Sequence, residues 1–183
     1  VMEFMEGQPL NRVLSRALRT VPTEHWIRVL VDALSGLHHA HEATDRTGRP
    51  MNLVHRDVSP HNVFVTWEGG VKLLDFGIAA FERADRTDRT EDGVIKGKLT
   101  YMAPEQAMGG VVDRRADLFS VGIILWEILA SRRMWPKMAD HLVYQELVQG
   151  NLPRLEIVAP HTPPELVAIC ERALAMEPVD RFQ

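Results

Sequence analysis

The sequence predicts an α+β fold in which a mainly α-helical lobe carries one small β-hairpin. Helical spacing of apolar residues recurs along most of the 183 residues, whereas β-rich runs occur mainly as one adjacent pair, at 62–66 and 71–74. Strands and helices do not alternate, which argues against a βαβ array. Apolar residues make up 45% and charged residues 25% of the chain, the composition of a globular domain with a sizeable core.

The first elements are short. Val1–Met5 is an apolar-rich run that predicts a strand, and Gly7 and Pro9 predict that it ends in a turn. A short helix is expected over Leu10–Ala17.

A long amphipathic helix is expected over Glu24–Ala40, because its apolar residues recur at intervals of three and four. Pro22 marks its start and Thr23 is the expected cap. A polar loop over Asp45–Pro50 follows it.

The β-rich runs Asn62–Thr66 and Val71–Leu74 are joined by Trp67-Glu68-Gly69-Gly70, which predicts a hairpin. The charged segment Thr87–Gly93 is expected to be a mobile loop. Three further helices are expected: one at Asp117–Ala130 that is buried on most sides, and two at His141–Gln149 and Pro164–Met176.

Three motifs carry the chemistry. The run His55-Arg56-Asp57-Val58-Ser59-Pro60-His61-Asn62 precedes the hairpin, Asp75-Phe76-Gly77 follows it, and Ala103-Pro104-Glu105 comes later. In order and spacing they resemble the H-R-D-x-x-x-x-N, D-F-G and A-P-E motifs of protein kinases. The resemblance implies a protein-kinase-like fold and transfer of the γ-phosphate of ATP to a protein hydroxyl.

The residue types suit that reaction. Phosphoryl transfer needs Mg²⁺ on the phosphate oxygens and an oxygen nucleophile held in line. Mg²⁺ prefers oxygen ligands, and Asn62 and Asp75 offer an amide and a carboxylate oxygen. Asp57 lies five residues before Asn62 and can orient the incoming hydroxyl and accept its proton.

The resemblance also divides the chain. Residues 1–9 correspond to the kinase hinge, where the backbone at Glu3 and Met5 would bind adenine. Residues 10–183 correspond to the C-terminal lobe, truncated before its last helix. The resemblance implies an N-terminal lobe, with a glycine-rich loop and a lysine, that residues 1–183 do not contain. That lobe is therefore an expected partner besides the protein substrate, and the fragment alone is expected to be inactive.

Two positions depart from the family pattern. The lysine usually found two residues after the catalytic aspartate is replaced by Ser59, and the threonine usually found in the activation segment is replaced by Lys98. Our hypothesis is that the two groups have exchanged places, so that Lys98 faces the phosphate and Ser59 supplies the hydroxyl. The alternative is that Lys98 is exposed to solvent.

Other matches are structural. The resemblance implies that Glu105 pairs with Arg181, that Asp117 accepts hydrogen bonds from the catalytic-loop backbone, and that His55 packs and bonds in the core. Arg56 is expected to bind a phosphorylated activation loop, for which Thr87 and Thr90 are the candidate acceptors; plain solvated threonines are the alternative.

The residues of these motifs resemble those of bacterial serine/threonine kinases, especially those of delta-proteobacteria. A pseudokinase or scaffold lobe is the main alternative function, and a small-molecule phosphotransferase is a weaker one. A metal site at His38 and His41 is the weakest reading, because no further ligand pattern accompanies them.

Composition limits partners and location. The net charge of −4 does not indicate a nucleic-acid-binding surface or contact with an anionic membrane. The single cysteine, Cys170, predicts a reducing compartment and a buried, unreactive thiol. With no visible signal peptide, a cytoplasmic location is expected.

Overall fold

The computed structural model describes residues 5–76 and 99–183. Its sheet has three antiparallel strands, β1 (Gly7–Pro9), β2 (Val63–Thr66) and β3 (Val71–Leu73), in the order β1-β2-β3. The predicted hairpin is therefore confirmed as β2 and β3, with Val63 opposite Leu73.

The predicted turn at Gly7 and Pro9 is wrong, because both residues lie in β1. Proline cannot donate a hydrogen bond, and it is tolerated here because β1 is an edge strand. Gly7 pairs with Thr66, and a Cβ at Gly7 would lie 2.2 Å from the carbonyl oxygen of Val65. Glycine therefore serves close backbone approach between strands at this position.

Helix α1 (Leu10–Ala17) matches its predicted bounds. Helix α2 (Thr23–His41) follows Pro22, and no side chain caps its start, so Thr23 is the first helical residue and the prediction that it is the cap is wrong. The amphipathic pattern is confirmed, since a buried stripe runs through Trp26, Leu30 and Leu37. The polar loop after α2 is closed by a bridge between Thr44 and Pro50.

The C-terminal half contains five helices among its described residues, and two short 3₁₀ turns. They are η1 (Leu99–Tyr101), α4 (Pro104–Ala107), α5 (Arg114–Leu129), α6 (Asp140–Gln149), α7 (Leu155–Val158), α8 (Pro164–Ala173) and η2 (Pro178–Asp180). The order of elements confirms a helical lobe with a small sheet.

Helix α5 begins three residues before the predicted start. The Asp113 carboxylate accepts a hydrogen bond from the Arg115 backbone at 2.9 Å and so caps the helix. Asp117 is consequently inside the first turn of α5 rather than at its start. Helix α8 ends at Ala173, three residues before the predicted Met176.

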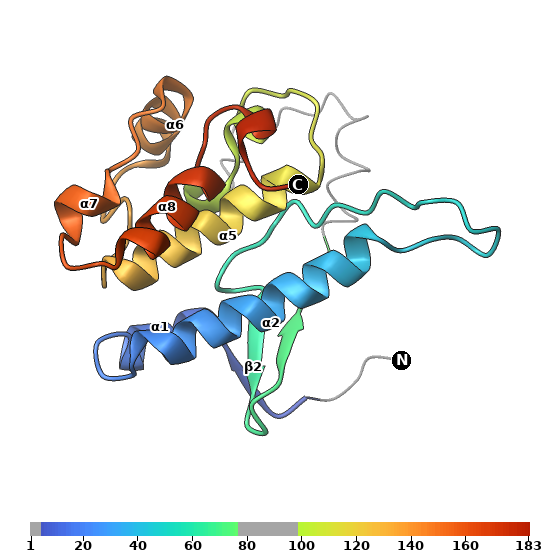
Figure 1. The fold of residues 1–183 in the computed structure, drawn as a ribbon, viewed down its shortest axis with the longest axis horizontal. Helices are drawn as coiled ribbons and strands as arrows, with labels where there is room; N and C mark the ends of the chain where they lie inside the picture. Colours follow the sequence, from blue (N-terminus) through green and yellow to red (C-terminus); the bar gives the residue numbers. More distant parts are fainter. Residues whose placement is uncertain (1–4, 77–98) are drawn as a thin grey trace.

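Helix α5 is the centre of the core. It lies between α2 and α8 (Figure 1), and nearly all its residues from Ala116 to Ile128 are buried. This confirms the prediction of a helix buried on most sides. Cys170 of α8 is completely buried, and burial raises the pKa of its thiol to about 12, so the thiol is protonated and unreactive at neutral pH.

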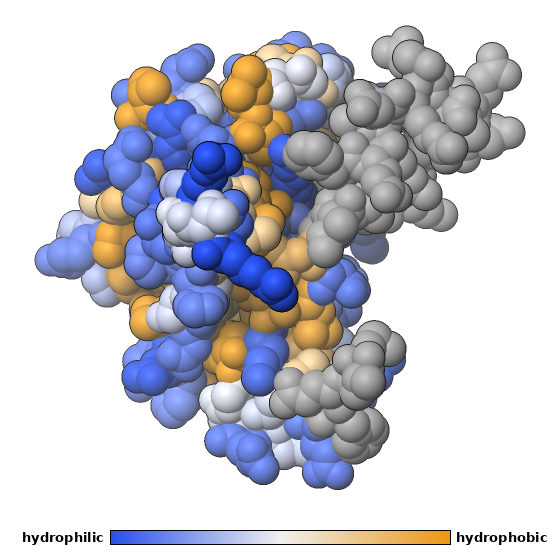
Figure 2. Space-filling model, turned by 90° about the vertical axis from the view of Figure 1, so that its right-hand side faces the viewer, coloured by the Kyte–Doolittle hydropathy of each residue, from blue (hydrophilic) through white to orange (hydrophobic). Residues whose placement is uncertain are grey.

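One side of the lobe exposes apolar residues. Hydrophobic side chains gather along the middle of this face, and hydrophilic side chains dominate the part to their left (Figure 2). None of the helices in residues 5–76 and 99–183 has the length and apolar composition needed to cross a bilayer.

Two helical glycines provide a matched test of the packing around α5. A Cβ at Gly122 would lie 2.9 Å from the Cβ of Ala173, whereas a Cβ at Gly36 would contact Leu73 at an ordinary 3.4 Å. Gly122→Ala is expected to lower the free energy of unfolding by about 1–3 kcal/mol through overpacking. Gly36→Ala is expected to raise it by roughly 0.4–1 kcal/mol. Urea unfolding measures both, and equal effects would contradict the close α5–α8 packing.

Candidate active site

The segment 55–62 forms a tight loop that ends at β2. The Asn62 side-chain amide donates to the carbonyl oxygen of Asp57 at 2.8 Å, and its backbone N–H donates to the carbonyl of Ser59 at 2.9 Å. These two bonds hold Asp57 and Asn62 close together although they are five positions apart in the sequence. The backbone N–H of Asn11 in α1 also bonds the Pro60 carbonyl at 2.8 Å, which fastens the loop to the lobe.

The hairpin brings Asp75 back to the same place. Leu74 follows β3 directly, and its backbone N–H donates to the carbonyl of Asn62 at 2.8 Å. Asp75 therefore follows directly after a residue that is hydrogen-bonded to Asn62. Its side chain is exposed, and its backbone has φ 53°, a left-handed conformation that is uncommon for residues other than glycine.

His55 ties the loop to the end of the hairpin. Its ring lies 4.5 Å from the Phe76 ring, and its Nδ1 accepts a hydrogen bond from the Asp57 backbone at 3.3 Å. In the neutral ring the other nitrogen, Nε2, then carries the proton and donates to the Leu74 carbonyl at 3.0 Å. His55 is completely buried, which confirms the prediction that it packs and bonds in the core.

Asp117 of α5 anchors the loop through hydrogen bonds to its backbone. Its carboxylate accepts hydrogen bonds from the backbone N–H groups of His55 and Arg56, at 2.9 and 2.8 Å, and it is completely buried. This confirms the predicted role of Asp117. Arg56 has φ 63°, so the two anchors hold the residue before Asp57 in a strained conformation.

His41 is a residue of this site that the motif pattern missed. It ends α2, is buried, and its Nε2 lies 2.8 Å from the Asp117 carboxylate. A signal was present, since His41 continues the stripe of Leu30 and Leu37 by one further turn, where an apolar residue is expected. Among the described residues no metal-binding cluster of His, Cys, Asp and Glu occurs, so the structure offers no support for a metal at His38 and His41.

The donor set suits a magnesium ion. The Asn62 amide nitrogen donates to the Asp57 carbonyl, so the amide oxygen points away from that bond and is available as a ligand. The Asp75 carboxylate is exposed. One amide oxygen and one carboxylate are the hard oxygen ligands that Mg²⁺ takes together with substrate phosphates and water. Residues of this type and arrangement fit the ion.

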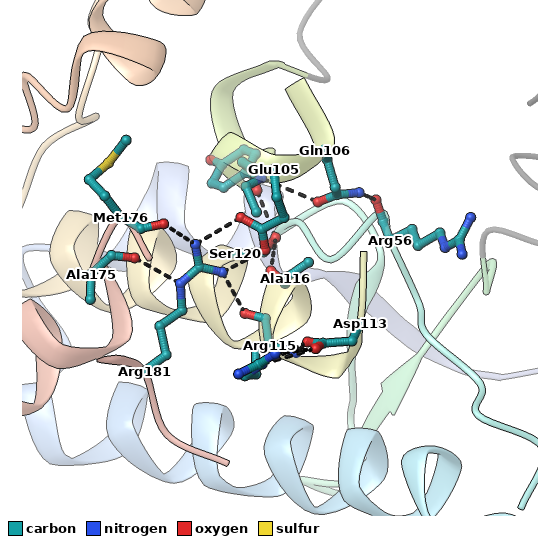
Figure 3. A network of polar contacts seen from close by, with 12 residues as sticks. Arg56, Glu105, Gln106, Asp113, Arg115, Ala116, Ser120, Ala175, Met176 and Arg181 are labelled. Carbon is teal, nitrogen blue, oxygen red and sulfur yellow. Dashed lines mark hydrogen bonds and ion pairs between the residues drawn. The ribbon is translucent and has the colours of Figure 1, made fainter. Parts of the chain in front are cut away.

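Glu105 and Arg181 form a buried ion pair (Figure 3). The guanidinium donates to both carboxylate oxygens, at 2.7 and 2.8 Å, and Arg181 is completely buried. It also donates to the carbonyl oxygens of Arg115, Ala175 and Met176. The predicted pairing is confirmed, and it joins α4, α5 and the end of the described chain.

Gln106 connects the same segment to the catalytic loop and was not foreseen. Its amide nitrogen donates to the Arg56 carbonyl at 3.0 Å, and its oxygen accepts from the backbone of Ala103 at 3.2 Å (Figure 3). The Ala103-Pro104-Glu105 motif is thus fixed both to the lobe and to the residue before Asp57.

The remaining predicted residues divide into two groups. Met5 is half-buried and precedes β1, and Ser59 is buried in the catalytic loop. Outside the described residues lie Glu3, Gly77, Lys98, Thr87, Thr90 and the loop expected at 87–93. The structure therefore brings together Asp57, Ser59, Asn62 and Asp75.

Comparison with known families agrees with this geometry. The family model described as "Protein kinase domain" matches residues 1–183. The chain belongs to the protein kinase family. The predicted kinase-like fold and the family resemblance are both confirmed.

Bacterial protein kinases are similar to this kinase chain along its length. A protein named tyrosine-protein kinase MasK from Myxococcus xanthus is 46% identical over 99% of the chain and 28% of its own length. Serine/threonine-protein kinase PksC from Streptomyces coelicolor is 36% identical over 100% of the chain and 32% of its own length. Serine/threonine-protein kinase PknL from Mycobacterium tuberculosis is 35% identical over 100% and 43%, respectively. The chain thus spans less than half the length of these curated relatives.

Proposed function

We propose that the protein transfers the γ-phosphate of ATP to a serine or threonine hydroxyl of a protein. One observation carries the proposal: hydrogen bonds from Asn62 to Asp57 and from Leu74 to Asn62 bring a candidate base and two candidate Mg²⁺ ligands together. Pseudokinases usually lack one of these three side chains, whereas Asp57, Asn62 and Asp75 are all present here.

Each side chain has a distinct task in the proposed reaction. The Asp57 carboxylate accepts a hydrogen bond from the substrate hydroxyl, orients its oxygen toward the phosphorus and takes the proton as the new bond forms. Asn62 and Asp75 would hold Mg²⁺, which neutralises charge on the phosphate oxygens when bound. Asp117 and His55 position the loop and do not touch the substrate.

The division of the domain belongs to the same proposal. Residues 1–9 form the hinge, with the backbone of Glu3 and Met5 on the adenine, and residues 10–183 form the C-terminal lobe. A separate N-terminal lobe closes over ATP and partners this one. The polypeptide 1–183 by itself has no phosphotransfer activity.

The phosphate-facing charge is supplied from the activation segment in this proposal. Ser59 occupies the usual lysine position and is only 8% exposed. Lys98→Ala in the full-length protein is expected to lower kcat by about 10²–10³-fold, as for loss of one preorganised charge at the reacting group. Lys137→Ala, which removes an exposed lysine after α5, is the control. A Lys98→Ala rate close to that of the control would contradict the exchange.

The phosphate acceptor is tested by phosphoamino acid analysis. Full-length protein is incubated with radiolabelled ATP, Mg²⁺ and a mixed protein substrate, in parallel with the polypeptide 1–183. Phosphoserine or phosphothreonine with the full-length protein, and no label with the short polypeptide, are the expected results. Phosphotyrosine alone would overturn the serine/threonine assignment, in line with the name of the Myxococcus relative. Turnover by the short polypeptide would overturn the two-lobe requirement.

A further inference from the structure

A cavity of about 320 Å³ lies where α1 and the turn after it meet the C-terminal end of α5. Arginine dominates its lining: Arg16 and Arg19 come from the α1 side, and Arg132 and Arg133 come from the α5 side. Leu14 and Ile128 are among the apolar side chains that line the cavity. In Figure 1 these elements meet at the left-hand end of the lobe.

The cavity carries an excess of positive charge in a chain whose net charge is −4. Glu127 is the one carboxylate in its lining. That carboxylate is nearly completely buried and is already engaged, since it accepts hydrogen bonds from the Tyr101 hydroxyl and an Arg133 N–H, both at 2.9 Å, and from the Met134 backbone at 3.1 Å. Burial, reinforced by the Glu127 charge, raises the pKa of Tyr101, so its phenol remains a neutral donor. Glu127 therefore offsets Arg133 and leaves three guanidinium groups in excess.

Those three arginines have hydrogen-bonding capacity to spare. Within residues 5–76 and 99–183, the side chains of Arg16 and Arg19 form no hydrogen bond or ion pair. Arg132 lies with its guanidinium carbon 5.1 Å from the Trp126 ring centroid and makes one long hydrogen bond, 3.4 Å, to the Arg133 carbonyl. The ring orients this guanidinium and leaves most of its N–H donors available.

The lining favours an oxyanion over a neutral polar group. The two hydroxyls in the lining already donate to backbone carbonyls, Ser15 to Arg12 and Thr20 to Ala17. The available donors are therefore guanidinium groups, whose planar fork matches the oxygens of phosphate and carboxylate.

Both walls of the cavity are hydrogen-bonded to segments of the candidate active site. Helix α1 bonds the catalytic loop through Asn11 and Pro60. Glu127 bonds Tyr101, which lies two residues before the Ala103-Pro104-Glu105 motif. A protein segment seated in the cavity is thus connected, through both walls, to the site that holds Asp57.

We propose that this cavity is a docking subsite for a phosphorylated segment of the protein substrate. The inference rests on the proposed kinase function for its biological meaning, but binding at the cavity requires no catalysis. The double variant Arg16→Gln/Arg19→Gln removes two exposed charges from the lining. Arg12→Gln/Arg46→Gln removes the same charge from exposed positions outside the cavity and serves as the matched control.

Binding is measured on the full-length protein by fluorescence anisotropy with three labelled probes of one sequence: a phosphoserine peptide, the same peptide with glutamate, and the same peptide with serine. We expect the phosphoserine probe to bind more tightly than the serine probe. The Arg16/Arg19 variant should weaken phosphopeptide binding by about tenfold or more, as expected for lost charge-assisted hydrogen bonds. The control variant should bind as the unmodified protein does.

The three probes separate the sources of the oxyanion. A glutamate probe that binds as tightly as the phosphoserine probe, and is equally sensitive to the Arg16/Arg19 change, would overturn the phosphorylated occupant in favour of an acidic segment. Equal binding of all three probes, or equal losses in the cavity variant and the control variant, would overturn docking at the cavity altogether. An Asp57→Asn protein should lose kinase activity and still bind the phosphopeptide. That result would support a docking subsite that is independent of the catalytic step.

Discussion

Asp57→Asn in the full-length protein is expected to lower kcat by about 10²–10⁴-fold, the usual contribution of a positioned general base. An amide cannot accept the hydroxyl proton, although it occupies the same volume. Two backbone contacts of the residue, its carbonyl with Asn62 and its N–H with His55, are kept in the variant. Urea unfolding checks that the fold is kept, and single-turnover phosphotransfer with saturating ATP and Mg²⁺ measures the loss.

The control for this change is Glu68→Gln, which neutralises an exposed carboxylate in the β2–β3 turn. It should keep the rate of the unmodified protein, and both variants should unfold at the same urea concentration as that protein. A rate for Asp57→Asn within a few-fold of the control would contradict the assignment of Asp57 as the base.

Arg181→Met is expected to lower the free energy of unfolding by about 3–5 kcal/mol, the cost of leaving a buried charge without its partner. Glu105 would lose both of its guanidinium contacts, and the carbonyl oxygens of Ala175 and Met176 would lose their donor. The guanidinium carbon also lies 4.8 Å from the Phe119 ring centroid, a contact that methionine only partly replaces. Urea denaturation of the full-length protein, followed by tryptophan fluorescence, measures the change.

Two further variants distinguish the stability effect of an unpaired buried charge from the effect of removing any arginine. Arg28→Met breaks an exposed ion pair with Asp32, at 3.1 Å, and should change stability by less than about 1 kcal/mol. The double variant Glu105→Gln/Arg181→Met should lose less than the sum of the two single changes, because the partners interact directly. Additive losses would show that the pair is not coupled.

Much of the fold could be predicted because it follows from local sequence patterns, namely apolar spacing and turn length. The spacing of Trp26, Leu30 and Leu37 identifies α2, and the four-residue connection between the β-rich runs identifies the hairpin. Motif order identified Asp57, Asn62 and Asp75 as one site, since a hairpin must return the chain to where it started.

Other features could not be predicted because they depend on partners distant in sequence. Gly7 and Pro9 look like turn residues, and only pairing with β2 makes them a strand. His41 looks like one of several helical histidines until α5 places Asp117 beside it, 76 residues away. Gln106 likewise acquires its role only when the Arg56 carbonyl lies within reach, 50 residues earlier in the chain.

The sequence by itself determined the family, the helical lobe and the candidate catalytic side chains, because periodicity and motif spacing are properties of consecutive residues. Only the tertiary structure decided how those side chains are held. The strained backbone at Arg56 persists because the buried carboxylate of Asp117 accepts hydrogen bonds from two consecutive N–H groups. The arginine-lined cavity likewise exists only because α1 and the end of α5, more than 100 residues apart, pack at the same end of the lobe.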